Sequence, residues 1–346
     1  MGLFDMDFIS NIKTQSSFHQ LLTWFLSPKS VYLENEEPWN INLFAQNICY
    51  LYKNLPFVDK KLVSSSIKIP EFDERDYPKS DKSFLGPIQH LKSYIKEELK
   101  DYLMDFLIHG SISTADYSIG WSDLDTFVIL KSQTFENHKA LIEFRNKIIK
   151  AHDFLLKIDV HQHHGFIFCT EFGLDQYFSF LPEQVLKKSK SLIGHNIIKL
   201  QSHRDQDFLI KVFSNKNDLL RSAFNNKILH HHKYQNEYLQ EDFQNINTMY
   251  QLKYFLSIVM TLPTYYLDAI GEPCYKKDSF SKVKNKFINE WEIVEKATQI
   301  RALWQVKEDF PYNSNKIPDW VVELLGGDYF FRAYKLSNKM LEEINK

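Results

Sequence analysis

The chain of 346 residues carries 42 lysine and arginine residues against 44 aspartate and glutamate residues, a formal net charge of -2. A nearly neutral chain has no general attraction to nucleic acid or to an anionic membrane, so we expect neither a long nucleic acid nor a membrane as partner. The composition, 44% hydrophobic and 15% aromatic with ten glycines and eleven prolines, excludes disordered and collagen-like proteins and predicts two or three folded domains.

Three widely spaced cysteines, Cys49, Cys169 and Cys274, lack any C-x-x-C pairing. This pattern predicts neither a disulfide framework nor a cysteine zinc site and favours a reducing cytoplasm. The first residues contain two aspartates where a secretory signal needs positive charge, so we expect a cytoplasmic protein.

Apolar residues recur at helical spacing over residues 18–26 and 41–55, and a stretch with prolines and charges follows. We therefore expect residues 1–83 to form a helical N-terminal extension that ends in a linker. The spacing between residues 88 and 103 then predicts a further helix.

Residues 84–204 alternate between strand and helix patterns, which predicts a mixed sheet with flanking helices. The expected strands are residues 105–109, 123–130, 156–162 and 165–170, with a helix over 136–152. Residues 205–346 carry mainly helical patterns and predict a helical C-terminal domain. Its longest apolar run, residues 254–267, contains Pro263 and is too short to span a bilayer, so we expect a buried helix. The whole chain is expected to be an α+β protein.

The segment from Phe106 to Leu130 has a chemically informative pattern. Gly110 and Ser111 follow an apolar strand, and Asp123 and Asp125 begin the next one. Side chains two residues apart on a strand point to the same side, with Cα atoms about 6.6 Å apart, so these two carboxylates can share divalent metal ions. A two-metal site usually has one further carboxylate, for which Asp159 on the expected third strand is the candidate. Glycine lets the backbone approach a phosphate closely at Gly110.

This arrangement resembles the nucleotidyltransferase superfamily of the DNA polymerase β type. The shape G-S-x(8)-G-x-S-D-L-D, followed by an apolar strand, is most similar to the small-molecule branch that includes aminoglycoside adenylyltransferases. The similarity in motif covers about residues 88–165. It implies a nucleotidyltransferase-fold sheet in residues 84–204, and a helical domain after it is usual in that branch.

The resemblance implies a role for each matching residue. Gly110 and Ser111 would hold the triphosphate of a nucleotide such as ATP, and Asp123 and Asp125 would bind two Mg²⁺ ions. Asp159 would ligate one ion and help to deprotonate the acceptor hydroxyl. A basic residue of the helical domain, Lys276 or Lys277, would reach the phosphates; the alternative, that both are surface lysines, is the simpler explanation.

Three aromatic or histidine positions allow additional substrate contacts. Trp121 lies in the loop before the aspartates, where it either stacks on a base or acceptor ring or belongs to the core. On a strand, His161 and His163 would face the same way as Asp159. They would then contact substrate, form with Asp159 the metal site of a hydrolase, or have a structural role at a sheet edge.

We expect a magnesium-dependent nucleotidyltransferase that moves a nucleoside monophosphate from a nucleoside triphosphate to a hydroxyl of a small molecule and releases pyrophosphate. The alternatives are a catalytically silent nucleotide-binding scaffold of the same fold and the metal-dependent hydrolase. The acceptor and the oligomeric state do not follow from the sequence.

Overall fold

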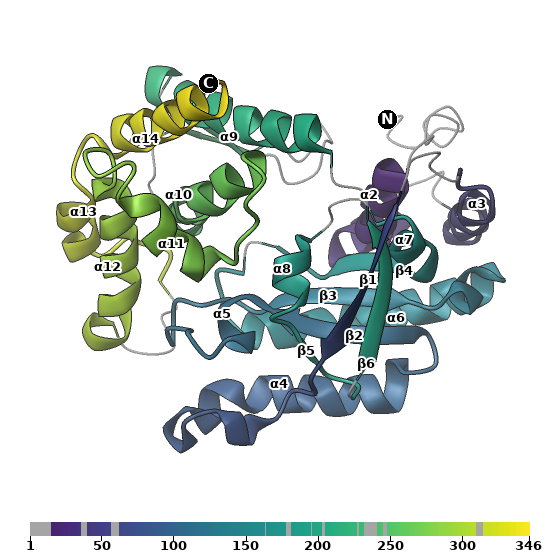
Figure 1. Ribbon diagram of the computed structural model, residues 1–346. Helices are drawn as coiled ribbons and strands as arrows, with labels where there is room; N and C mark the ends of the chain where they lie inside the picture. Colours follow the sequence, from purple (N-terminus) through teal and green to yellow (C-terminus); the bar gives the residue numbers. More distant parts are fainter. Residues whose placement is uncertain are drawn as a thin grey trace. The chain divides into compact units, whose positions relative to one another are not determined.

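The computed structural model describes residues 15–35, 40–56, 62–162, 164–177, 181–194, 196–202, 205–226, 228–231, 241–244, 248–308 and 314–346. The chain divides into two compact units (Figure 1). The first contains Met1–Tyr117, Ser122–Val160 and Gly165–His203, and the second contains Ser118–Trp121, His161–His164 and Arg204–Lys346. The fold is α+β, with a mixed sheet, many helices and a helical C-terminal region.

A four-stranded mixed sheet organises the first unit, with the strand order β4-β3-β2-β5. Its strands are β2 (Leu103–His109), β3 (Asp125–Leu130), β4 (Ile167–Thr170) and β5 (Lys190–Ser191). β3 runs antiparallel to β2 and parallel to β4. The strand predicted at 105–109 is confirmed, and those predicted at 123–130 and 165–170 are present but each begins two residues later than expected.

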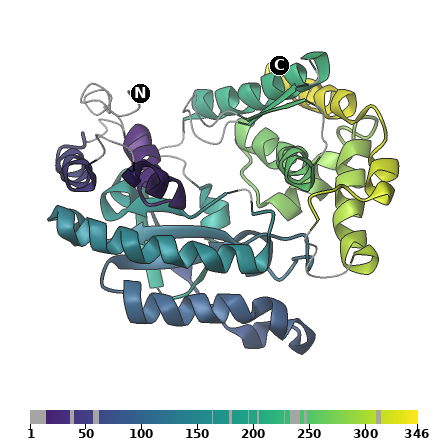
Figure 2. The same ribbon diagram turned by 180° about the vertical axis from the view of Figure 1, so that it is seen from behind.

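Two long helices, α4 (Lys82–Tyr94) and α6 (His138–Ile158), pack against each other on one face of this sheet (Figure 2). A π-helical turn, η4 (Ile95–Leu99), extends α4. Asn137 caps the N-terminus of α6, and its side chain accepts a hydrogen bond from the Ala140 amide. The aromatic ring of Phe144 in α6 lies 6.5 Å from that of Phe168 in β4, so α6 is anchored on the strand that follows it.

The prediction of a strand at 156–162 is wrong, because α6 continues to Ile158 and Asp159 caps its C-terminus. Buried side chains recur along α6 at intervals of three or four residues up to its end. They include Phe144, Ile148, Leu155 and Ile158. This helical period reaches beyond the residue at which we expected the helix to stop.

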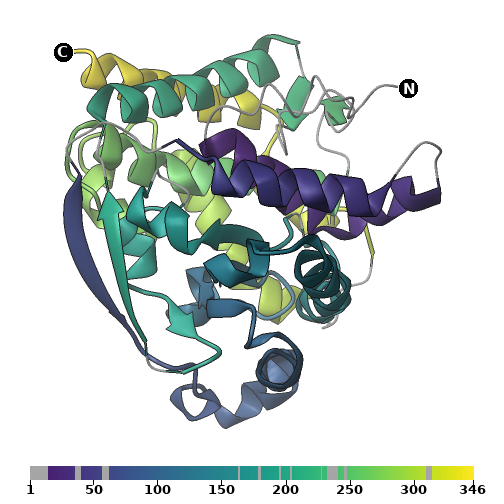
Figure 3. The ribbon, with the colours of Figure 1, turned by 90° about the vertical axis from the view of Figure 1, so that its right-hand side faces the viewer.

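The opposite face of the sheet is covered by a two-stranded antiparallel ribbon, β1 (Val63–Ile69) and β6 (Asn196–Ser202), seen side by side in Figure 3. Apolar side chains of both strands share a core with the sheet. These side chains are Ile67, Ile69, Ile198 and Leu200, and they join Leu107, Phe127 and Ile129 of the sheet. The expected linker before residue 83 therefore contains a strand. Alternation of Ile67 and Ile69 with polar neighbours is the period of a half-buried strand.

The N-terminal helices α2 (Gln15–Phe25) and α3 (Ile41–Lys53) belong to the same unit as the sheet. The buried guanidinium of Arg145 in α6 donates to the Phe25 carbonyl and to the Ser30 hydroxyl. The ring of Tyr52 stacks on Phe135 at 4.1 Å. The acceptors satisfy the buried charge of Arg145 and attach the N-terminal segment to α6, while the stacked rings attach α3 to η5 (Ser132–Phe135).

The first unit is completed by short helical segments. They are η1 (Pro28–Asn35), η2 (Glu74–Asp76), η3 (Lys79–Asp81), α5 (Gly110–Ser113), η5 (Ser132–Phe135), α7 (Glu171–Asp175) and α8 (Glu183–Leu186).

The second unit is mainly helical, as predicted, and contains one small antiparallel strand pair. Its elements are α9 (Gln206–Asn226), β7 (Ile228–His231), β8 (Glu241–Gln244), α10 (Met249–Ala269), α11 (Lys276–Lys284), α12 (Glu292–Lys307), α13 (Asp319–Leu325) and α14 (Tyr329–Ile344). The predicted buried helix is α10, which contacts α9, α11, α12 and α14. Within the residues that the structure describes, no helix has both the length and the apolar character needed to cross a membrane.

A buried carboxylate ties β2 to β5 and to the start of β6. Asp105 is fully buried and accepts hydrogen bonds from the Ser191 hydroxyl, the Asn196 amide and the Phe106 backbone. Burial raises the pKa of the Asp105 carboxyl, and the three donors oppose this rise. The Ser191 hydroxyl in turn accepts hydrogen bonds from the backbone amides of Ile193 and Gly194.

Replacing Asp105 by alanine leaves the Ser191 hydroxyl and the Asn196 amide without this acceptor. We expect Asp105→Ala to lower the free energy of unfolding by about 2 to 3 kcal/mol in urea titrations. The exposed Asp101→Ala is the control and should change it by less than about 0.5 kcal/mol. Equal effects of the two substitutions would contradict this role of Asp105.

Candidate functional site

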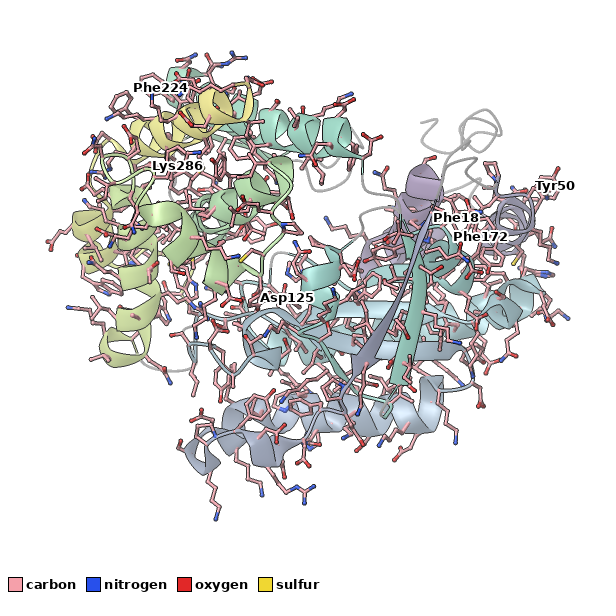
Figure 4. All side chains as sticks on the ribbon, viewed as in Figure 1. Phe18, Tyr50, Asp125, Phe172, Phe224 and Lys286 are labelled. Atoms are coloured by element: carbon pink, nitrogen blue, oxygen red, sulfur yellow. The ribbon has the colours of Figure 1, made fainter. Side chains whose placement is uncertain are left out.

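The β2–β3 ladder ends at the pair His109 and Asp125, so Gly110 and Asp125 emerge from the sheet at the same edge. Gly110 has φ +68° and opens the short helix α5. A Cβ atom on Gly110 would lie 2.0 Å from Oδ2 of Asp125, which is far inside van der Waals contact. Figure 4 labels Asp125 at this end of β3. Glycine is therefore required at position 110 both by the backbone angle and by the carboxylate against it.

Three side-chain hydroxyls donate hydrogen bonds to backbone carbonyls of the Gly110–Ser113 turn. The hydroxyls of Ser113 and Thr114 donate to the Gly110 carbonyl, at 2.9 and 3.1 Å. Tyr77, from the segment before α4, donates its hydroxyl to the Ile112 carbonyl at 2.8 Å. The half-buried Ser111 therefore lies in a turn whose backbone is fixed on both sides.

The turn closes with a Schellman arrangement that contains a strained residue. The amides of Asp116 and Ala115 donate to the carbonyls of Ser111 and Ile112, respectively. Ala115 has φ +54°, a left-handed backbone conformation that an alanine adopts at a cost of about 1 kcal/mol. Its hydrogen bonds compensate for this cost and fix the path of the chain as it leaves the turn.

Two carboxylates and one imidazole converge beside this turn. One potential ligand atom each from Asp123, Asp125 and His164 lies within 4.8 Å of the other two, and all three side chains are half-buried. Two carboxylate oxygens and a ring nitrogen are donors that divalent metal ions accept. This group can hold a metal ion.

Asp123 lies just before β3 and not within it, because the strand begins at Asp125. The chain turns at Gly120, which has φ +76°, before it reaches Asp123. The two carboxylates nevertheless lie close together, with the buried Leu124 between them in the sequence.

His164 stands where the sequence analysis expected a carboxylate. It lies three residues before Ile167, the residue of β4 that pairs with Phe127 of β3. Asp159 caps α6 and is buried, and among the described residues the group of potential metal ligands contains His164 and not Asp159. The assignment of Asp159 depended on a strand that the chain does not form. The helical period of α6 is the signal in the sequence that places Asp159 at the end of a helix and leaves the histidines after it as candidates.

The structure places the residues predicted as substrate contacts in environments other than the group of Asp123, Asp125 and His164. Trp121 is buried in the core of the second unit, 5.1 Å from the ring of Trp304, so the structure favours the core alternative over base stacking. The Nε2 atom of His161 is hydrogen-bonded to the Ser314 carbonyl at 3.0 Å, and His163 lies outside the described residues. The parity argument for a hydrolase site of Asp159, His161 and His163 fails, because Asp159 and His161 are not on a strand.

The predicted phosphate-binding lysines begin α11 in the second unit. Lys276 is half-buried and Lys277 is exposed. Their role at phosphate stays a prediction.

Comparisons with known proteins add no relative: no protein-family model matches the chain, and neither a curated protein nor a solved structure does.

The first prediction for the site concerns the glycine under Asp125. We expect Gly110→Ala to lower the free energy of unfolding by at least about 2 kcal/mol, because the new methyl group needs a left-handed backbone and displaces the Asp125 carboxylate. Urea titration measures this change. Gly194→Ala is the matched control, because a Cβ atom there meets nothing within 4 Å, and its effect should stay within about 0.5 kcal/mol. A Gly110→Ala protein as stable as the control would contradict the packing of Asp125 on Gly110.

The second prediction concerns His152, which packs against Phe166 at 4.2 Å just after the His164 segment. Burial lowers the pKa of His152 to about 4. The folded protein therefore keeps the ring neutral, whereas the unfolded chain takes up a proton below about pH 6.5. His152 therefore does not reduce the free energy of unfolding above about pH 6.5. Between pH 6.5 and 4 it lowers this free energy by on the order of 3 kcal/mol in total.

Urea titrations at pH 7 and pH 4.5 test this for the wild type and for His152→Gln, which stays neutral at both values. The variant should lose clearly less stability on acidification than the wild type does. Parallel losses in the two proteins would show that His152 does not titrate with a lowered pKa.

Proposed function

We propose that this protein is a metal-dependent nucleotidyltransferase, which transfers a nucleoside monophosphate from a nucleoside triphosphate to a hydroxyl of a small molecule. In this reaction the acceptor oxygen forms a bond to the α-phosphorus, and the bond from that phosphorus to the β-phosphate oxygen breaks. Pyrophosphate leaves, and the acceptor hydroxyl gives up its proton. The near-neutral charge of the chain favours a small acceptor over a long nucleic acid.

The observation that carries the proposal is the contact between the Gly110 turn and the Asp125 carboxylate. It brings together the two halves of the sequence pattern, a glycine that permits close approach of a phosphate and an acidic pair that attracts a cation. Phosphoryl transfer depends mainly on positioning and on neutralisation of charge, and this arrangement provides groups for both.

The strand order around these groups also supports the proposal. The glycine turn follows β2, the acidic pair leads into the antiparallel β3, and His164 precedes β4, which is parallel to β3. Three consecutive strands of the chain thus carry their polar residues to one edge of the sheet.

Each residue has a defined part in the proposed reaction. Gly110 and Ser111 receive the phosphates of the nucleotide, with Lys276 or Lys277 as further phosphate contacts. Asp123, Asp125 and His164 hold a divalent ion, which supplies positive charge against the phosphate oxygens. The family resemblance implies two Mg²⁺ ions, whereas the proposed reaction itself requires only that Asp123, Asp125 and His164 hold a divalent ion. Which nucleoside triphosphate is used does not follow from the sequence.

The test is incubation with each α-labelled nucleoside triphosphate, Mg²⁺ or Mn²⁺ and a metabolite extract, with measurement of pyrophosphate and of labelled products. We expect transfer by the wild type and a loss of at least about a hundredfold in Asp123→Asn/Asp125→Asn, because the amides do not neutralise a cation. Asp101→Asn, an exposed aspartate of the same unit, is the control and should keep full activity.

Two results would contradict the proposal. A wild type that releases no pyrophosphate with any nucleotide and extract, while it still binds nucleotide, would indicate the silent scaffold. Transfer that persists undiminished in the double variant would place the activity elsewhere or in a contaminant.

A further inference from the structure

The ligand set beside the glycine turn is mixed, with two carboxylates from Asp123 and Asp125 and one imidazole from His164. Magnesium prefers oxygen ligands in strict octahedral geometry and seldom accepts a ring nitrogen. Imidazole suits transition-metal ions, which bind nitrogen and carboxylate oxygen together. The composition of the group therefore bears on which ion it selects.

His164 ends the short segment His161–His164, which groups with the second unit. The side-chain amide of Gln162 donates to Nδ1 of His164 at 3.2 Å and to the His164 carbonyl at 2.9 Å. These two hydrogen bonds orient the imidazole. Its potential ligand atom lies within 4.8 Å of those of Asp123 and Asp125.

We propose that His164 is a direct metal ligand and that it makes the site selective for a transition-metal divalent ion, such as Mn²⁺, over Mg²⁺. This inference rests on the metal site used in the proposed function, but not on nucleotidyl transfer itself. In this site His164 takes the place of a third carboxylate. Its neutral nitrogen donor reduces the negative charge available to a hard cation and adds the donor that transition metals favour.

The experiment uses the whole protein and metal ions alone. Free Mn²⁺ is measured by electron paramagnetic resonance during titration, and Mg²⁺ is added in competition. Electron spin echo modulation of bound Mn²⁺ then reports any directly coordinated ¹⁴N. We expect ¹⁴N modulation in the wild type and a Kd for Mn²⁺ at least about tenfold below that for Mg²⁺.

Two variants remove the nitrogen and keep an oxygen donor, His164→Asp and His164→Gln. Both should lose the ¹⁴N modulation, and His164→Asp should reduce the preference for Mn²⁺ over Mg²⁺ by about tenfold or more. The matched control is His161→Asn, because His161 lies in the same loop and is hydrogen-bonded to Ser314 instead. It should keep both the modulation and the preference.

The outcomes separate this inference from the proposed function. A wild type that binds no Mn²⁺, or binds it without ¹⁴N modulation, overturns the inference whether or not the variants fold. Modulation that survives in both His164 variants overturns it as well. Nitrogen-ligated Mn²⁺ in a protein that transfers no nucleotide would support the metal site while the proposed function fails.

Discussion

The close contact between the Asp125 carboxylate and the α-carbon of Gly110 is the constraint on which the candidate site depends. The β2–β3 ladder brings both residues to the same edge of the sheet, and only a residue without a side chain fits beneath the carboxylate. The turn after Gly110 is in turn held by Ser113, Thr114 and Tyr77. The carboxylate and the glycine turn thus lie together at the end of the β2–β3 ladder.

The rest of the first unit supports this edge from both faces of the sheet. α4 and α6 cover one face, and the β1–β6 ribbon covers the other. Tyr77 shows that the segment before α4 is more than a connection, since its hydroxyl reaches the turn directly. The N-terminal helices are attached to α6 through the buried Arg145 and to η5 through the stacked rings of Tyr52 and Phe135. Figure 4 also labels Phe18 and Phe172 in this region, where each ring lies near that of Tyr52.

Much of this organisation follows from periodicity in the sequence. The strands that begin the pattern, β2 and β4, and the helices of the second unit were predictable because their apolar residues recur at regular intervals. The acidic pair and Gly110 were also predictable as a group, since a glycine after one strand and aspartates before the next meet at one edge. The β1 strand was not predicted because prolines and charges follow it directly, although Ile67 and Ile69 alternate as strand residues do.

His164, the third member of the group of potential metal ligands, was not predicted, and the reason lies in α6. Leu155 and Ile158 continue the helical pattern, but the alternation of apolar and polar residues from Leu156 onward also fits a strand. Because of this ambiguity, Asp159 was expected on a strand. The proximity of His164 to Asp123 and Asp125 depends on contacts between residues far apart in the sequence, which a local pattern does not contain.

The most direct test of the proposed metal and phosphate site is a crystal structure of the protein with Mn²⁺ and a nucleoside triphosphate analogue that carries a non-hydrolysable α,β-methylene group. We expect an ion bound by Asp123, Asp125 and His164, with the phosphates of the analogue against Gly110 and Ser111. Phosphates bound away from the Gly110 turn, or an ion bound without the aspartates, would contradict it.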